Sequence, residues 1–335
     1  MKDLIRMLSA GMNLSAEDSE KAMKLIFSGK STPAQTAAFL SLLAVKGETP
    51  TEIAAFARVM REHAEKVHPN VRGTLVDVCG TGGDAVKTFN ISTTAMFVVA
   101  AAGVAVAKHG NRSFTSKCGS ADVLEALGAD LNRTPKKIEM MIEQIGIGFM
   151  FAPMHHGAMK NVAPVRKELG IRTVFNILGP LSNPAGARSQ LMGVYDPALT
   201  EKLVAVFKEL GAERALVAYG SPGLDELSTL GKTKISELAD GEVRNYVVAP
   251  EDFGFEKAEA KDLAGGSPEE NAKTLVSILS CEDSGPRRDI VLLNAAAGIL
   301  VGGKAENLGE GIEAAKDAID SGGAYRKLEE FRGFR

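Results

Sequence analysis

The segment TLVDVCGTGGD, which runs from Thr74 to Asp84, decides the fold. Its first six residues are mostly apolar, as in a buried strand, and a glycine-rich loop follows directly. The polar stretch Asn90–Thr94 then opens an apolar pattern over residues 92–102 that predicts a helix. A strand, a glycine-rich loop and a helix in this order predict an α/β fold, with the loop at a strand end where such sheets bind ligands.

The alternation of strands and helices continues along the chain. Val104–Ala107 is a second predicted strand, and Arg214–Tyr219 is another, which follows a predicted helix at Ala198–Leu210. Such alternation predicts a mostly parallel sheet covered by helices. We therefore expect residues 71–335 to form one larger α/β domain.

Residues 1 to about 67 contain only helix signals. Thr32–Gln35 and Thr49–Glu52 each combine a threonine N-cap, a proline at the first helical position and a capping-box residue. The apolar residues within 37–45 predict a helix that is buried against other helices. We expect residues 1–70 to form a small all-helical domain, with the junction at His68-Pro69-Asn70.

The composition limits the possible classes of function. The 335 residues are 45% hydrophobic and 24% charged, and the net charge of −3 does not favour a nucleic-acid-binding face. The longest apolar run, Ala95–Ala107, is too short to cross a bilayer, and the N-terminus lacks a signal-peptide core. Cys79, Cys118 and Cys281 have no metal-binding spacing, so we expect a reduced, cytoplasmic setting.

The glycine-rich loop Cys79–Asp84 predicts a phosphate-binding site. Glycines let backbone N–H groups approach an anion closely, and the N-terminus of the following helix favours negative charge. A Walker A motif does not fit, because Val86 and not glycine precedes Lys87-Thr88. The alternative is a tight turn without a ligand, but the order of strand, loop, polar segment and helix favours phosphate.

A dinucleotide site is less compatible with the sequence. Gly80, Gly82 and Ala85 fit the spacing of that fingerprint, but the second strand should then end in an acidic residue. It ends instead in Lys108-His109. The following helix also begins several residues after the loop, so we discount a nicotinamide enzyme.

A cationic loop follows the second strand. Lys108–Ser113 and Lys117 supply three cations together with hydroxyl groups, and Ser120 is a candidate N-cap for a helix at 121–127. Lysine and arginine with directed hydroxyl donors are what a multiply charged phosphate ester needs. The alternative is a solvated surface loop, and this loop alone does not decide between the two.

Two adjacent acids, Asp225 and Glu226, follow the strand Arg214–Tyr219. Mg²⁺ is usually held by one or two carboxylates together with waters and substrate phosphates. A solvated acidic turn, or Asp225 as a helix cap, would be the simpler interpretation of the pair in isolation. The two anion sites upstream favour a metal site.

Five stretches together resemble the anthranilate phosphoribosyltransferase family, in the expected order and over nearly the whole chain. They are Gly80–Asp84, Asn90–Thr93, Lys108–Arg112, Asn176–Pro184 and Leu224–Glu226. The stretch at 176–184, NILGPLSNP, beside Arg166 and Arg172, is especially specific. The resemblance implies a fold like that of the class II nucleoside phosphorylases, with the active site between a small helical and a larger α/β domain.

The resemblance also implies the reaction. The 5-phosphoribosyl group of phosphoribosyl pyrophosphate (PRPP) would pass to the amine of anthranilate, giving N-(5-phosphoribosyl)anthranilate and pyrophosphate in tryptophan biosynthesis. Two Mg²⁺ ions, brought partly by the diphosphate, would take part. No covalent nucleophile is needed, so we expect no catalytic cysteine.

The resemblance assigns the residues of each site. Those for PRPP are Gly80, Gly82, Gly83, Asp84, Thr88, Asn90, Ile91, Ser92, Thr93, Lys108, Asn111, Arg112 and Ser120. Those for anthranilate are Gly80, Asn111 and Arg166, and those for the metal are Ser92, Asp225 and Glu226. His109 and His156 would line the route of the aromatic substrate and serve for orientation or as a base.

Relatives of this kind are usually homodimers paired through the helical domain, which part of 165–190 would join. For Arg166, the interpretation without the family pattern is an exposed salt bridge, since Lys167 and Glu168 are its neighbours. Within the cationic loop, Ser113-Phe114-Thr115 and Cys118 differ from the small and hydroxyl residues typical of the family.

Two other functions on the same fold remain open. A pyrimidine-nucleoside phosphorylase would need neither an acidic metal pair nor a diphosphate loop, so Asp225-Glu226 and Asn176–Pro184 argue against it. An inactive paralogue that binds nucleic acid should have lost the metal ligands and gained a basic groove. The acids are present and the net charge is negative.

Overall fold

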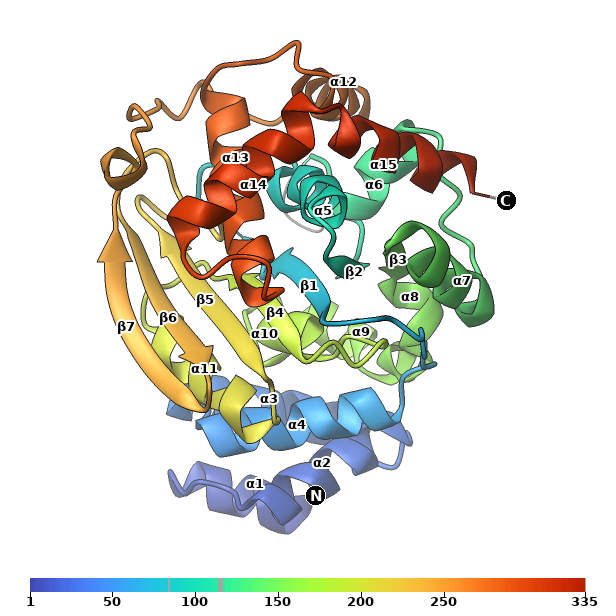
Figure 1. Cartoon of the computed structure of the whole chain (residues 1–335). Helices are drawn as coiled ribbons and strands as arrows, with labels where there is room; N and C mark the ends of the chain where they lie inside the picture. Colours follow the sequence, from blue (N-terminus) through green and yellow to red (C-terminus); the bar gives the residue numbers. More distant parts are fainter. Residues whose placement is uncertain (84, 114–116, 335) are drawn as a thin grey trace.

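A seven-stranded sheet forms the centre of the computed structural model, which describes residues 1–83, 85–113 and 117–334 (Figure 1). Its strands are β1 (Leu75–Gly80), β2 (Ala105–Gly110), β3 (Ile147–Phe151), β4 (Ser189–Gly193), β5 (Arg214–Gly220), β6 (Thr233–Ala239) and β7 (Glu242–Val248). The order is β3-β2-β1-β4-β5-β6-β7. The first five strands in this order are parallel, and β6 and β7 add an antiparallel edge. The predicted mostly parallel sheet is confirmed.

The sequence predicted β1, β2 and β5 but not the other strands. Ile147–Phe151 is a short, uninterrupted apolar run, and periodicity cannot distinguish such a run from a buried helix segment. Glu242–Val248 forms an edge strand whose first four residues are exposed and, apart from Val243, polar, so it lacks the apolar character of the central strands. The antiparallel edge is therefore a finding of the structure.

The N-terminal segment is helical throughout, as predicted. Its helices are α1 (Lys2–Ser9), α2 (Ala16–Phe27), α3 (Pro33–Lys46) and α4 (Pro50–Glu62). Both predicted capping boxes are present: Thr32 caps α3 with Gln35, and Thr49 caps α4 with Glu52. Each box satisfies N–H groups that the first turn of a helix leaves without partners.

The remaining helices alternate with the strands or follow them. They are α5 (Ile91–Ala101), α6 (Ser120–Ala126), α7 (Pro135–Ile145), α8 (Ala152–His155), α9 (Ala163–Leu169), α10 (Phe175–Leu181), α11 (Leu199–Glu209), α12 (Pro268–Leu279), α13 (Pro286–Val301), α14 (Leu308–Asp320) and α15 (Gly323–Gly333). Short 3₁₀ helices cover Gly157–Asn161 and Pro250–Phe253. Ser120 is not the N-cap of α6 as predicted, because Gly119 holds that position and Ser120 is the first helical residue. Among the described helices, none combines the length and apolar character that a membrane span needs.

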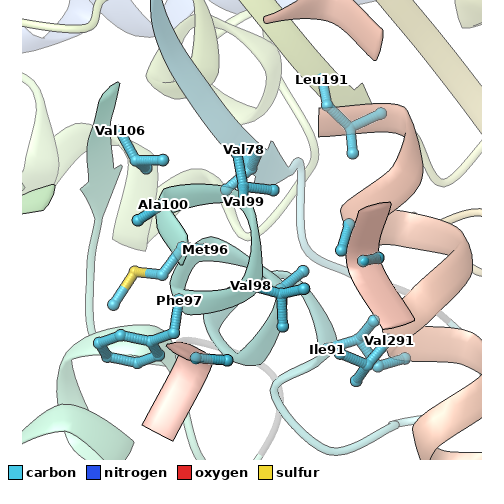
Figure 2. Close-up of a cluster of buried hydrophobic side chains, with 14 of the residues drawn as sticks. Val78, Ile91, Met96, Phe97, Val98, Val99, Ala100, Val106, Leu191 and Val291 are labelled. Atoms are coloured by element: carbon cyan, nitrogen blue, oxygen red, sulfur yellow. The ribbon is translucent and has the colours of Figure 1, made fainter. Parts of the chain in front are cut away.

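Two large clusters of buried side chains cover the two faces of the sheet. On one face, α5 packs between β1 and α13, and Figure 2 shows Val78, Val99 and Val291 among the side chains that meet there. On the other face, α11 packs against β5 and β6, and α10 belongs to the same buried cluster, which includes Leu178, Val204 and Val217. The helices α1–α4, at the bottom of Figure 1, belong to this second cluster.

The arrangement of the strands fixes where a ligand can bind. The chain passes from β1 outward to β2 and β3, and then returns to place β4 on the other side of β1. This reversal lies at the carboxyl ends of β1 and β4, where open α/β sheets bind ligands. β1 ends at Gly80, within the predicted glycine-rich loop, and β4 ends beside it at Gly193.

Candidate active site at the carboxyl ends of the central strands

The acidic pair after β5 folds back over the ends of β1 and β4. A side chain at Gly80 would overlap the Asp225 carboxylate, and one at Gly193 would overlap the Asp225 backbone. Both strands therefore need glycine at their ends, because only the absence of a Cβ leaves room for this segment. The predicted loop and the predicted acids thus lie together, although they are far apart in the sequence.

Asp225 contacts the glycine-rich loop directly. Its Oδ2 accepts a hydrogen bond of 2.6 Å from the backbone N–H of Gly82. No described helix begins at Asp225, so the helix-cap interpretation of this residue is wrong. The carboxylate lies at the inner surface of the predicted diphosphate loop.

Glu226 lies at the N-terminus of α5. Its Oε1 accepts the backbone N–H of Ser92 at 3.1 Å, and its side chain is almost fully buried. Burial, reinforced by the neighbouring Asp225 carboxylate, raises the pKa of Glu226 to about 8, although Lys108 and Ser92 oppose the shift. A buried acid with a strongly raised pKa is typical of a functional site.

Lys108 supplies a buried positive charge beside these acids. Only 2% of the residue is exposed, and its Nζ donates to the Val78 carbonyl and, at 3.3 Å, to Ser92 Oγ. The hydroxyl of Ser92 therefore lies beside the lysine, while the Ser92 N–H holds Glu226. Three of the predicted donor-site and metal-site residues meet at this point.

The donor set fits Mg²⁺ that shares its coordination with a phosphate ester. Asp225, Glu226 and Ser92 offer hard oxygen ligands, which this ion prefers. Within the described residues, no group of three or more His, Cys, Asp or Glu side chains gathers that could hold an ion unaided. Oxygens of a substrate would have to complete the coordination shell.

The N–H groups of the glycine-rich loop are partly used within the protein. Thr81 N donates to the Gly193 carbonyl at 3.0 Å, and Gly82 N donates to Asp225. Among the described residues, no acceptor pairs with the N–H of Gly83 or of Thr93 in the first turn of α5. An anion could accept hydrogen bonds from these two N–H groups without breaking a hydrogen bond within the described residues.

Asn90 is held by a residue that the sequence analysis did not identify. Asn271 of α12 donates to Asn90 Oδ1 at 3.0 Å, and Asn90 Nδ2 donates to the Cys118 carbonyl at 3.2 Å. Asn271 is buried, and its own Oδ1 accepts the Gly266 N–H. No motif marks Asn271, because only the fold brings α12 beside the start of α5.

The predicted residues of the cationic loop separate into two groups. Lys108 points into the site, whereas Arg112 pairs with Asp122 at 3.0 Å and with Glu125. These acids on α6 neutralise the Arg112 charge, which weakens the argument for Arg112 as a phosphate ligand. Ser120 Oγ donates to the carbonyl of Asn111 at 3.2 Å, so Asn111 and Ser120 belong to one turn.

The predicted PRPP site also includes Ile91, Thr88 and Asp84. The Ile91 side chain is buried in the core shown in Figure 2, and its N–H donates to the Phe89 carbonyl. Thr88 forms an isolated β-bridge with Ala264. Asp84 lies outside the described residues, as do Phe114 and Thr115 of the cationic loop.

His109 and His156 form a buried pair beside the site. Their ring centroids are 5.0 Å apart, and both residues are less than 10% exposed. Burial, with the neighbouring histidines, holds the pKa of His109 well below its usual value, and burial lowers the pKa of His156 to about 4. Both rings are therefore neutral at pH 7.

The tautomer of His109 follows from its neighbour. Its Nδ1 lies 3.3 Å from the Gly179 carbonyl, which can only accept, so Nδ1 carries the proton. The buried Nε2 is then a lone-pair acceptor, and it has no hydrogen-bond partner among the described residues. A buried acceptor without a partner is suited to a donor group on a ligand.

Arg166 is half-buried and stacks over the Phe175 ring at 5.4 Å. No described carboxylate forms an ion pair with it, so the exposed salt bridge considered from the sequence is absent within residues 1–83, 85–113 and 117–334. Arginine held by an aromatic face is well placed to pair with a planar carboxylate.

The NILGPLSNP stretch forms α10 and the turn after it. Asn183 Nδ2 donates to Asp77 Oδ2 at 2.7 Å and to the Ala107 carbonyl at 2.8 Å. Burial raises the pKa of Asp77 to about 6, and the Lys108 charge and the Asn183 hydrogen bond oppose this shift. The stretch therefore attaches α10 beneath β1 and β2, which fixes the position of Gly179 against His109.

Comparisons with known proteins agree with this geometry. Residues 72–325 match the model of the glycosyl transferase family a/b domain, and residues 2–64 match that of the family's helical bundle domain. An anthranilate phosphoribosyltransferase from Symbiobacterium thermophilum is 55% identical over 334 residues, which is 100% of this chain and 97% of the relative.

Solved structures show the same likeness. Anthranilate phosphoribosyltransferase from Thermus thermophilus superposes with a TM-score of 0.94 at 44% identity, over 99% of each chain. The enzyme from Saccharomyces cerevisiae in complex with PRPP and Mg gives a TM-score of 0.89 at 30% identity, over 99% of this chain and 96% of that one. The yeast enzyme in complex with 4-fluoroanthranilate also gives a TM-score of 0.89, at 29% identity and the same coverage.

Proposed function

The chain belongs to the anthranilate phosphoribosyltransferase family, and on this basis we infer that it transfers the 5-phosphoribosyl group of PRPP to the amine of anthranilate. The bond between the anomeric carbon and the pyrophosphate oxygen breaks, a bond to the amine nitrogen forms, and the amine gives up a proton. The products are N-(5-phosphoribosyl)anthranilate and pyrophosphate, a step of tryptophan biosynthesis.

One observation carries the assignment of the donor site. Asp225 accepts a hydrogen bond from Gly82, and Glu226 accepts one from Ser92, so the acids join the glycine-rich loop to the start of α5. A diphosphate that enters there meets carboxylates, the Lys108 ammonium and backbone N–H groups within one small region. A nucleoside phosphorylase would have no need of the acids.

The donor side stabilises the leaving pyrophosphate. We propose that Asp225, Glu226 and Ser92 hold Mg²⁺, which when bound would neutralise charge on the diphosphate. Two such ions are what the family resemblance implies. Lys108 and the N–H groups of Gly83 and Thr93 would add fixed positive potential, which needs no reorganisation during the reaction.

The acceptor side orients anthranilate. Arg166 would pair with the carboxylate of the aromatic acid, and Asn111 would contribute at the boundary with the donor site. His109 Nε2, a neutral acceptor, would accept a hydrogen bond from the aromatic amine. This contact would direct the lone pair of the amine nitrogen at the anomeric carbon. The low pKa of His109 makes it a weak base, so orientation is its main role.

Three further properties follow from the family resemblance and stay proposals. They are a homodimer paired through the helical domain, a cytoplasmic location, and a boundary near residue 70 with part of 165–190 joined to the helical side. The exposure of Val45 on α3 supports the first, because 87% of this apolar residue is exposed on a helix whose other side is buried.

A fluorescence assay tests the reaction. Anthranilate is fluorescent, and its signal should fall when PRPP and Mg²⁺ are added together, but not when a chelator removes the metal. Loss without Mg²⁺ would contradict the metal role. No loss with folded protein would contradict the proposed reaction and turn attention to phosphorolysis of nucleosides.

A double variant tests the metal ligands. Asp225→Asn with Glu226→Gln should abolish Mg²⁺-dependent turnover, by at least about 100-fold, because both carboxylate charges are lost. Circular dichroism should show an intact fold. The matched control is Asp240→Asn with Glu242→Gln, two exposed acids on the β6–β7 turn at the other end of the strands. Wild-type activity in the double variant at positions 225 and 226 would contradict the assignment of Asp225 and Glu226 as Mg²⁺ ligands.

A further inference from the structure

The connection between α9 and α10 has a defined conformation. Gly170 ends α9 in the left-handed region, at a φ of 63°, and its N–H donates to the Arg166 carbonyl. Three residues later, the N–H of Thr173 donates to Asn176 Oδ1 at 2.9 Å. The residues between these two points are therefore held at both ends.

Arg172, in the middle of this connection, makes two contacts with the α/β domain. Its guanidinium carbon lies 3.8 Å from the centroid of the Tyr195 ring, two residues beyond the end of β4. Its Nη2 donates to the carbonyl oxygen of Gly83 at 3.2 Å. Within the described part of the chain, no carboxylate forms an ion pair with Arg172, so these contacts are what orient its side chain.

The contact with Gly83 acts on the predicted diphosphate loop. Gly82 and Gly83 both have positive φ, at 73° and 81°, a conformation that favours glycine. Because glycine has no side chain, these two residues have no side-chain contacts to fix the turn. Thr81 N is fixed by Gly193 and Gly82 N by Asp225. The Ala85 N–H, just after the loop, donates to the Gly223 carbonyl. Arg172 adds an attachment of a different kind, because it donates to a carbonyl of the loop and does not accept from an N–H group.

The direction of that carbonyl matters for an anion. A backbone turn binds a phosphate through its N–H groups, so each carbonyl oxygen must point elsewhere. Arg172 donates to the Gly83 carbonyl, while the Gly83 N–H has no protein acceptor among the described residues. Without the guanidinium, the Gly83 carbonyl would be free to rotate toward the diphosphate and repel it.

We propose that Arg172 is a positioning residue for the PRPP site, acting through Gly83, and that Tyr195 holds Arg172 in place. The proposal rests on the proposed function, because it takes the loop to be the diphosphate site. It gives the segment 166–175 two roles: Arg166, stacked on Phe175, serves the acceptor, and Arg172, stacked on Tyr195, serves the donor.

The chain offers a matched control for Arg172. Arg188 is also an exposed arginine that donates to a glycine carbonyl, that of Gly211, at 3.3 Å. It precedes β4 and therefore lies at the opposite end of the strand from Tyr195. Arg188→Ala removes a similar side chain and a similar hydrogen bond, together with an ion pair to Glu213 at 3.0 Å, without affecting the diphosphate loop.

The first test measures Michaelis constants for both substrates. Arg172→Ala should raise the KM for PRPP about tenfold, the combined effect of a lost stack and a lost charge-assisted hydrogen bond. The KM for anthranilate and kcat should change less than about twofold. Arg188→Ala should leave all three unchanged. Arg166→Ala should show the reverse pattern, with a raised KM for anthranilate.

Further variants test whether Arg172 acts through its contacts. Arg172→Lys should not restore the KM for PRPP, because lysine keeps the charge but lacks the planar group that stacks on a ring. Tyr195→Phe should behave as wild type, since it keeps the ring face. Tyr195→Leu should raise the KM for PRPP, and combining it with Arg172→Ala should add little beyond Arg172→Ala alone.

Several outcomes would overturn the inference. An unchanged KM for PRPP in Arg172→Ala, equal increases in both KM values, or full rescue by Arg172→Lys would each do so. Additive effects of the Arg172→Ala and Tyr195→Leu changes would also contradict it. Wild-type turnover in the same assays shows that the proposed function holds, so a failure of the Arg172 inference is distinguishable from a failure of the reaction itself.

Discussion

At the scale of single residues, the buried side chain of His156 makes the free energy of folding depend on pH. His156 is 6% exposed and its Nε2 has no hydrogen-bond partner among the described residues. Burial lowers its pKa to about 4 from an ordinary value of 6.5. Between these values the unfolded chain binds a proton that the folded chain does not, so folding becomes less favourable as the pH falls from 6.5 toward 4.

This shift gives a prediction for His156. The wild-type protein should lose about 3 kcal/mol of unfolding free energy from this group between pH 7 and pH 4. His156→Gln should lose correspondingly less over the same range, as measured by urea unfolding at several pH values. His68→Gln, which changes an exposed histidine, is the control. Parallel pH dependence in wild type and His156→Gln would contradict the buried neutral state of this ring.

The sequence identified the chemistry of single residues better than their partners. Lys108, Ser92, Asp225 and Glu226 come together as the family pattern implied. Their spacing in the chain is too large for sequence alone to predict the contacts between them. The sequence does not indicate a role for Asn271 or Tyr195, because neither residue lies in a motif. Only the fold places them beside the site.

At the scale of secondary-structure elements, one buried carboxylate holds the N-terminal helices together. Glu52 of α4 accepts hydrogen bonds of 2.8 Å from the N–H groups of Leu14 and Thr49, and it pairs with Lys46 at 2.9 Å. Burial alone would raise the pKa of Glu52, but these hydrogen bonds and the Lys46 charge outweigh it and lower the pKa. The stabilisation is therefore present above the ordinary pKa of 4.5 and is lost as the pH falls below it.

We expect Glu52→Gln to destabilise the protein. The substitution leaves Lys46 buried without a counter-charge, and breaking a buried ion pair in this way costs about 3 kcal/mol. The midpoint of urea unfolding at pH 7 should fall accordingly, whereas Glu17→Gln, in the exposed first turn of α2, should leave it unchanged. Equal midpoints for the two variants would show that the Glu52–Lys46 ion pair makes no net contribution to the free energy of unfolding.

Elements with local signals were predictable, and elements defined by their neighbours were not. The capping boxes at Thr32 and Thr49 lie wholly within a few residues, so the starts of α3 and α4 follow from the sequence. The strand β4 at Ser189–Gly193 has no such signal, because it becomes a strand through its pairing with β1 and β5. Tertiary contacts decide the structure of such short segments.

At the scale of the whole molecule, an exposed apolar residue of α3 allows a test of the proposed homodimer. Val45 is 87% exposed beside helices that are otherwise well packed. If the homodimer forms through the helical domain, Val45→Glu should introduce a buried charge and shift light-scattering mass from dimer to monomer. Val247→Glu, at an exposed position on the edge strand β7, should remain dimeric. A wild-type monomer, or a dimer unaffected by Val45→Glu, would contradict this interface.

The buried cluster that contains the N-terminal helices has a consequence for folding during synthesis on the ribosome. The helices α1–α4 bury their apolar side chains in the same cluster as α10, α11, β4 and β5. They leave the exit tunnel well before Phe207 and Val217 of that cluster, which are translated much later. Until then part of their apolar surface has no permanent partner, so these four helices complete their packing long after they have been translated.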